Sequence, residues 1–260
     1  MRELKNIKLV IAYDGTNYFG WQKQQNKRTI QGIIENTISR ITGDLKVKVN
    51  GSGRTDAGVH ALAQVGNFFT DSSIPTDKWK FILNHQLPKD IRIKYAKEVG
   101  MKFHARYSAK SKFYQYLVMN RNYGESVFSA KHIFLRNYYY FVNKQLDIEK
   151  MRKVADYLVG YHDFTALSCF NQKENQPTKN RIRNIKRIGI TKKDQFICFN
   201  FEANAFLYKM IRIIVGTLID FSIKNRKPED ILELLKNRDN QKAGKVIPPH
   251  GLYLIKVRYR

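Results

Sequence analysis

The same order of strand-like and helix-like stretches occurs twice along the chain, and this repeat restricts the possible folds more than any other feature. In the first half the order is strand, helix, strand, strand, helix, strand, over residues 6–13, 30–42, 45–49, 63–70, 76–87 and 91–99. The second half repeats it over residues 112–119, 147–160, 182–191, 194–203, 206–222 and 251–259. This βαββαβ order is the ferredoxin-like arrangement. We predict an α+β protein of two ferredoxin-like halves, residues 1–105 and 106–260, packed around a central basic cleft.

Residue types that begin or end helices support these boundaries. Side-chain or glycine caps are expected at Thr29, Gly43, Thr76, Asp147 and Gly160. A further short helix is predicted over residues 228–237, because Pro228 suits the first turn of a helix and a spaced set of apolar residues follows it.

The balance of charge indicates the kind of partner. Lys and Arg number 47 against 22 Asp and Glu, which leaves a net charge of +25. Hydrophobic residues make up 43% of the chain, so it can bury a core and is not a disordered polycation. An excess of this size favours a polyanionic partner, most often nucleic acid. A solvated basic surface is the alternative.

Several classes of site are disfavoured by what the sequence lacks. Cys169 and Cys198 have no neighbours at metal-ligand spacing, so neither a disulfide scaffold nor a cysteine zinc site is expected, and we predict no metal. The apolar stretch 206–222 is interrupted by charged residues and is too polar to span a membrane. The amino-terminal stretch has no signal-peptide core. We expect a cytoplasmic protein with no membrane partner.

One acidic residue stands out in the stretch GRTDAGVHA, residues 53–61. Asp56 lies between two glycines and two positions after Arg54. Asp and Gly are common turn residues, so Asp56 could be no more than a side-chain cap. The sequence has no cluster of carboxylates for two metals, no His/Cys zinc set and no phosphate-binding glycine loop. What remains is chemistry by one carboxylate in a basic cleft, such as nucleophilic attack on a sugar or a base.

Five motifs in order resemble the tRNA pseudouridine synthase A family. They are YDGTNYFGWQ (13–22), GRTDAGVHA (53–61), FHARYSAKSKFYQY (103–116), FLYKMIRIIVGTL (206–218) and PPHGLYL (248–254). The resemblance implies the pseudouridine synthase fold and isomerisation of uridine to pseudouridine at positions 38, 39 and 40 of the tRNA anticodon stem–loop. It also implies a homodimer that needs no metal or organic cofactor.

The resemblance assigns roles to four residues of this sequence. Asp56 matches the family's nucleophile. Arg54 matches an arginine that fills the space left by the flipped uridine or contacts its phosphate. Tyr114 matches the tyrosine that lies against the target base, and Arg212 the basic residue that pairs with the nucleophile. The family often has Asn after that arginine, whereas this chain has Ile213.

Residues that could hold the RNA are suggested by charge and aromatic character. Lys209 lies three positions before Arg212, so on a helix both would share one side. The segment 179–193 carries seven Lys or Arg residues, and Phe19 and Trp21 could stack on bases or wedge between them. The predicted RNA contacts are therefore Phe19, Trp21, Lys209, Arg181, Arg183, Lys186 and Arg187.

Other interpretations of these residues stay open. Tyr114 could be a core tyrosine, Arg212 a cation at the edge of a core, and the lysines of 179–193 a solvated sheet edge. His60 is expected to be a hydrogen-bonded structural group and not a general base. The rival functions are a non-catalytic RNA-binding or RNA-chaperone protein on the same fold, and a related synthase that acts on another RNA. Asp56 could capture the sugar, capture the pyrimidine ring, or assist loss of a sugar proton.

Overall fold

A computed structural model describes residues 3–120, 130–170 and 180–259. Contacts within the chain divide it into two compact units. Unit 1 comprises residues 1–110 and 253–260, and unit 2 comprises residues 111–252. The last residues of the chain thus have most of their contacts in unit 1, unlike in the predicted division. In the described ranges, no helix is both long and apolar enough to cross a membrane.

Unit 1 has the ferredoxin-like strand order. Its strands are β1 (Lys5–Tyr13), β2 (Asn50–Gly51), β3 (His60–Thr70) and β4 (Ile91–Val99). Strand β1 lies antiparallel between β3 and β4, and β2 pairs with the far side of β3. Strand β10 (Leu252–Arg258) adds a short parallel pairing, in which Tyr253 and Leu254 face His60 and Ala61.

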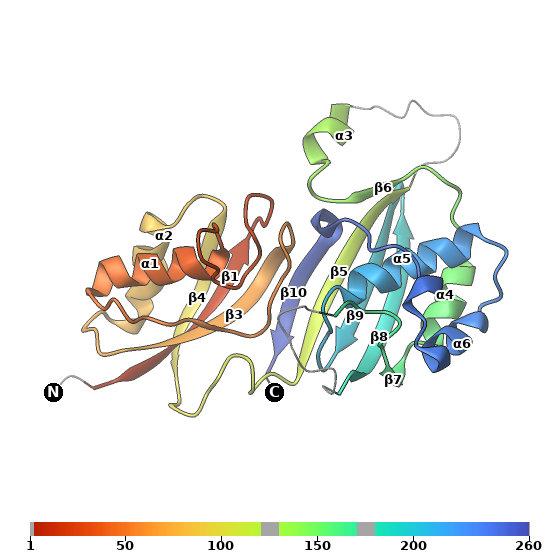
Figure 1. Ribbon diagram of the computed structural model, residues 1–260. Helices are drawn as coiled ribbons and strands as arrows, with labels where there is room; N and C mark the ends of the chain where they lie inside the picture. The colour runs from red at the N-terminus through yellow and green to blue at the C-terminus, as the bar shows by residue number, and fades with distance from the viewer. Residues whose placement is uncertain (1–2, 121–129, 171–179, 260) are drawn as a thin grey trace. The chain divides into compact units, whose positions relative to one another are not determined.

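Helices cover one face of this sheet, as Figure 1 shows for α1 (Ile30–Thr42) and α2 (Trp79–Gln86), which follows the 3-10 turn η1 (Thr76–Lys78). Alternate residues of β1 point into the core, so Ile7, Leu9 and Ile11 are fully buried. The ring of Phe68 on β3 meets Trp79 of α2 edge to face, with ring centroids 5.2 Å apart.

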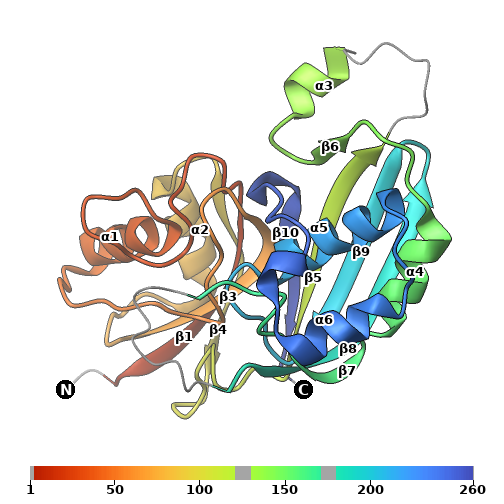
Figure 2. The same cartoon turned by 45° about the vertical axis from the view of Figure 1, so that its right-hand side comes forward.

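Unit 2 is built around four strands paired antiparallel. The strands β5 (Ser111–Asn120), β9 (Phe196–Ala203), β8 (Ile182–Lys193) and β7 (Gly160–Asp163) are neighbours in that order, and β6 (Tyr140–Val142) pairs with β5. The helices are α3 (Ala130–Leu135), α4 (Ile148–Asp156), α5 (Met210–Ile223) and α6 (Asp230–Asn237), and Figure 2 shows α4, α5 and α6 gathered on one side of the sheet. The 3-10 turns η2 (Asn240–Lys242) and η3 (Pro249–Gly251) precede β10.

Helix α5 forms the centre of the core of unit 2. It is buried almost all round, and Ile213 is only 2% exposed. The isoleucine that stands where the family often has asparagine is therefore a packing residue in this chain.

Two predicted elements differ from the structure. Residues 45–49 form no strand, because the backbone N–H of Val49 donates to the Glu35 carboxylate and not to a neighbouring strand. The last helix of the second half begins at Met210 and not at residue 206, because Lys209 has a left-handed backbone with φ of 59°. Lys209 and Arg212 are consequently not neighbours on one helix, and that expectation was wrong.

The predicted helix ends are partly confirmed. Thr29 accepts a hydrogen bond from Gly32 N at 3.3 Å, and Asp147 accepts one from Lys150 N at 2.9 Å. Gly43 ends α1 in the left-handed conformation, with φ of 77°. Thr76 is not a cap, since it is the first residue of η1 and makes no capping bond. Helix α4 ends at Asp156, and Gly160 instead begins β7.

We expect Gly43→Ala to lower the free energy of unfolding by about 1 kcal/mol, because an L-residue is strained at this φ. Gly100→Ala is the matched control, since neither position has an atom within 4 Å of an added Cβ and Gly100 has no positive φ. Urea unfolding measures both. Equal stability of the two variants would contradict the prediction.

Candidate active site

Asp56 lies in the loop between β2 and β3, and its side chain is half-buried. The loop is fixed at its start by Gln64, which is fully buried on β3. Ser52 Oγ donates to Gln64 Oε1 at 2.6 Å, and Gln64 Nε2 donates to the Gly53 carbonyl at 3.0 Å. Next to Asp56, the Thr55 hydroxyl bonds with the Tyr13 hydroxyl at 2.8 Å. Burial raises the pKa of Tyr13, so this hydroxyl stays protonated at neutral pH.

A second loop, residues 14–22, packs against the Asp56 loop. Trp21 N donates to the Thr55 carbonyl at 3.1 Å, and Gly58 N donates to the Tyr18 carbonyl at 3.3 Å. Gly20 has φ of 80°, and a Cβ there would lie 2.4 Å from Thr55 O and 3.0 Å from the Asp56 carbonyl carbon. The two backbones can touch at this point because Gly20 has no side chain.

His60 is a buried structural group at the end of this loop, as the sequence predicted. It is 2% exposed and stacks on Tyr253 with ring centroids 4.8 Å apart. The Gly15 backbone N–H and Asp14 Oδ1 each lie 3.1 Å from its Nδ1. An Nδ1 without a proton accepts the Gly15 N–H, whereas an Nδ1 with a proton donates to the Asp14 carboxylate. The two contacts therefore belong to different protonation states of Nδ1.

Arg54 is exposed beside Asp56. Its Nε donates to Gln22 Oε1 at 3.2 Å, which joins the two loops through side chains at the surface. Phe19 is also at the surface, with 51% of its area exposed and the Lys27 ammonium 4.6 Å from its ring centre. Trp21 is 2% exposed and packs over Gly51, so the expectation that it can stack on a base was wrong.

Tyr114 and Arg212 belong to unit 2 and differ in their burial and in their contacts. Tyr114, on β5, is 7% exposed and meets Phe206 edge to face at 5.2 Å. Arg212, on α5, is half-buried and its Nε donates to the Ile247 carbonyl at 2.7 Å. Burial raises the pKa of the neighbouring Tyr116, and the nearby Arg212 cation acts against that rise.

The predicted RNA-binding cations differ in exposure. Lys186 and Arg187 are both exposed, because the pairing of β8 with β9 is irregular between Ile185 and Arg187 and breaks the alternation there. Arg181 and Arg183 are half-buried, and Arg181 Nη2 donates to Ser168 Oγ at 2.6 Å. Lys209 lies over the ring of Tyr208 at 5.0 Å. Lys179, at the start of this basic segment, lies outside the described residues.

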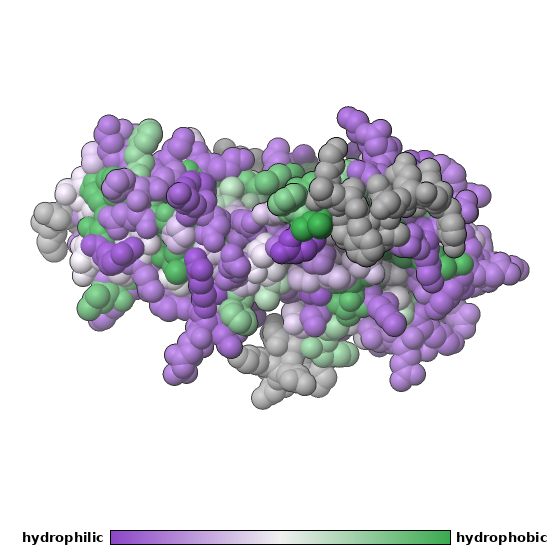
Figure 3. Space-filling view, turned by 90° about the horizontal axis from the view of Figure 1, so that it is seen from above, coloured by the Kyte–Doolittle hydropathy of each residue, from purple (hydrophilic) through white to green (hydrophobic). Residues whose placement is uncertain are grey.

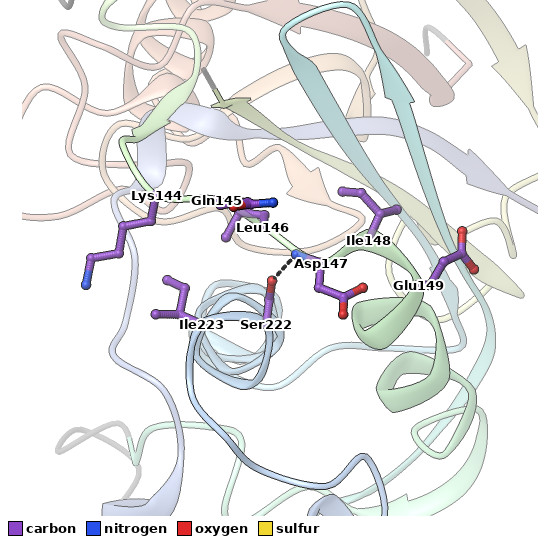
Figure 4. A pocket seen from close by; sticks show the side chains of 8 residues that line it. All are labelled: Lys144, Gln145, Leu146, Asp147, Ile148, Glu149, Ser222 and Ile223. Carbon is purple, nitrogen blue, oxygen red and sulfur yellow. Dashed lines mark hydrogen bonds between the residues drawn. The ribbon is translucent and has the colours of Figure 1, made fainter. Parts of the chain in front are cut away.

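Among the described residues, neither the pocket in Figure 4 nor a cluster of metal-ligating side chains is a better candidate for the active site than the Asp56 loop. The pocket, of about 690 Å³, lies in unit 2, where Asp147 N donates to Ser222 Oγ at 2.5 Å. None of the predicted site residues lines it. In the part of the chain that the structure describes, no group of three or more His, Cys, Asp or Glu could hold a metal.

Sequence reasoning missed Gln31 and Glu35 of α1, whose side chains bind two chain segments next to the Asp56 loop. Both are buried, at 6% and 4% exposure, next to the isoleucines that face the core. Two polar residues one turn apart beside an apolar stripe are the signal that could have found them.

Comparisons with known proteins support one family. The tRNA pseudouridine synthase family model matches residues 9–108 and 154–260. The tRNA pseudouridine synthase A of Caldicellulosiruptor saccharolyticus is 46% identical over 98% of this chain and all of its own length. The enzymes of that name from Acetivibrio thermocellus and Clostridium botulinum are 43% identical over the same shares.

We expect Gly20→Ala to destabilise the protein more than Gly43→Ala, by about 1–3 kcal/mol of overpacking in addition to the shared backbone strain. Both positions have φ near 80°, but only Gly20 would press a Cβ onto the Asp56 loop. Urea unfolding and hydrogen exchange at residues 53–58 measure the difference. If the loop exchanges equally slowly in both variants, the two loops are not held by this contact.

Proposed function

The chain belongs to the tRNA pseudouridine synthase family, and we propose that it isomerises uridines 38, 39 and 40 of the tRNA anticodon stem–loop with Asp56 as nucleophile. The observation that carries the assignment of Asp56 is the way its loop is held. The residues on each side of Asp56 are fixed by hydrogen bonds with β3, with the Tyr13 hydroxyl and with residues 18–21, while its side chain is half-exposed. A carboxylate that only capped a turn would not need this support.

The reaction suits a single carboxylate. The C1′–N1 glycosidic bond breaks, the uracil ring turns while bound, and a C5–C1′ bond forms as C5 loses its proton and N1 gains one. Atoms and electrons balance without an oxidant or a reductant. Asp56 assists by attacking the sugar, attacking the ring, or removing a sugar proton.

Three other residues keep the roles that the family resemblance proposes for them. Arg54 is exposed next to Asp56 and suits either the space of the flipped uridine or its phosphate. Tyr114 offers an aromatic ring to the uracil, and its contact with Phe206 fixes the plane of that ring. Arg212 supplies a cation whose direction is set by its bond to the Ile247 carbonyl.

We propose that the exposed cations and Phe19 hold the tRNA. Among the described residues on the face in Figure 3, hydrophilic ones predominate and apolar ones form separate patches, which suits a charged partner. Action in the cytoplasm and as a homodimer is proposed from the family resemblance. A non-catalytic RNA-binding protein is the weaker alternative, because binding alone would not need a supported carboxylate.

Asp56→Asn should abolish turnover and leave tRNA affinity within about threefold, because the amide keeps the shape but cannot attack. Tritium release from tRNA labelled at uridine C5 measures turnover, and filter binding measures affinity. Asp77→Asn, on exposed η1, is the control for the same substitution. Appreciable product from pure Asp56→Asn protein would refute the role of Asp56.

Affinity for tRNA should fall steeply with salt, since each phosphate neutralised adds about 0.7–0.9 to the slope of log K against log salt. Replacing three exposed cations of β8 with Gln should reduce the magnitude of that slope by about two to three, if each cation neutralises one phosphate. The three are Lys186, Arg187 and Lys193. The control replaces three exposed lysines with the same loss of charge, Lys224, Lys227 and Lys236. An equal change in both triple variants would show that β8 is not a specific RNA face.

A further inference from the structure

The buried pair Gln31 and Glu35 connects the two chain segments that hold the Asp56 loop. The two residues lie one turn apart on α1, and Gln31 Nε2 donates to Glu35 Oε1 at 2.9 Å. A buried amide and a buried carboxylate are unfavourable unless they are bonded, and both are well bonded in this structure. The groups that these two side chains bind indicate the role of the pair.

The first segment bound by the pair leads into β2. Glu35 Oε1 accepts a hydrogen bond from Val49 N at 3.0 Å, and Gln31 Nε2 donates to the Val49 carbonyl at 3.1 Å. Val49 directly precedes β2, after which the Asp56 loop begins. Both polar groups of this one residue are therefore fixed by α1.

The second segment bound by the pair touches the Asp56 loop itself. Gln31 Oε1 accepts a bond from Lys23 N at 2.8 Å, and Gln31 N donates to the Trp21 carbonyl at 2.9 Å. Trp21 N in turn donates to Thr55 O at 3.1 Å. At the rim, the half-exposed Lys23 ammonium lies 3.2 Å from Glu35 Oε2. The bond from Gln31 N to Trp21 O is a backbone contact, whereas the Gln31 side chain fixes Lys23, two residues after Trp21.

We propose that Gln31 and Glu35 are positioning residues that set where the Asp56 carboxylate stands. The inference rests on the proposed function of Asp56. Apolar side chains of the same size would pack α1 equally well, but they would leave Val49 and Lys23 without these bonds. A nucleophile must lie within about 0.5 Å of its productive position, and a misplacement of about 1 Å can lower turnover on the order of a hundredfold.

The test compares Gln31→Leu with Asn84→Leu in the full-length protein. Asn84 is a matched control, because this amide on α2 also makes two backbone bonds, from Nδ2 to Ile93 O at 2.9 Å and to Oδ1 from Ile93 N at 2.8 Å. Gln31→Leu should lower kcat about tenfold or more with KM for tRNA nearly unchanged, whereas Asn84→Leu should keep kcat within about twofold. Hydrogen exchange at residues 21–23 and 53–58 should be faster only in Gln31→Leu.

Three further variants make the outcome decisive. Gln31→Asn, one methylene shorter, carries the test if the leucine variant does not fold, and should also lower kcat. Glu35→Gln keeps an oxygen for Val49 N, so it should keep most of the turnover that Glu35→Ala loses. Wild-type turnover in Gln31→Leu, or an equal loss of kcat in Asn84→Leu at equal stability, would overturn the proposal. Active Asp56→Asn protein would instead refute the proposed function, whatever the Gln31 variants do.

Discussion

The contact between the backbone at Gly20 and the Thr55–Asp56 peptide is the constraint on which the candidate active site depends. A side chain at Gly20 would collide with Thr55 O, so the two loops can pack this closely beside Asp56 because this residue is a glycine. Because they interlock, the hydrogen bonds from Trp21 to Thr55 and from Gly58 to Tyr18 can form on either side of Asp56. The position of the carboxylate therefore depends on this backbone packing together with the buried side chains that hold the two loops, such as Gln64 and Gln31.

The chain has few acidic residues for its net charge of +25, and several of them make hydrogen bonds that fix the two loops of the candidate site. Glu35 binds the segments beside the Asp56 loop, and Asp14 meets His60. Asp90 accepts a bond from Tyr18, where burial and then Asp90 raise the pKa of the tyrosine to about 12, so its hydroxyl remains a donor at neutral pH. Each of these carboxylates bonds with groups near it in unit 1, and these bonds fix the segments around Asp56, the proposed nucleophile.

The alternation of apolar residues predicted most of the sheet, because β1, β4 and β5 bury one side of each strand against helices. It failed at residues 45–49, where a side chain distant in sequence, Glu35, takes the hydrogen bond that a strand neighbour would have made. It failed again before Met210, because the apolar pattern continues through a residue whose backbone is left-handed. Composition could not separate buried Trp21 from exposed Phe19, since both rings occur in one short loop. Asp56 and Arg54 could be predicted from a motif. The spacing of Gln31 and Glu35 on α1 indicates a polar pair, but the groups that this pair binds are distant in sequence and no local pattern names them.

Binding and chemistry place opposite demands on this chain. Attraction of a polyanion needs only positive charge at the surface, so exposed cations such as Lys186 and Arg187 tolerate motion and a choice of partners. The proposed chemical step needs the Asp56 carboxylate at one place, and the bonds that hold the chain around it come from buried groups such as Gln64 and Gln31. A substitution at the surface should therefore change how much RNA is bound at a given salt concentration, whereas a substitution under the loop should change what happens to RNA that is already bound. The basic surface of this protein is for that reason a poor guide to its reaction, and the support of a single loop is a better one.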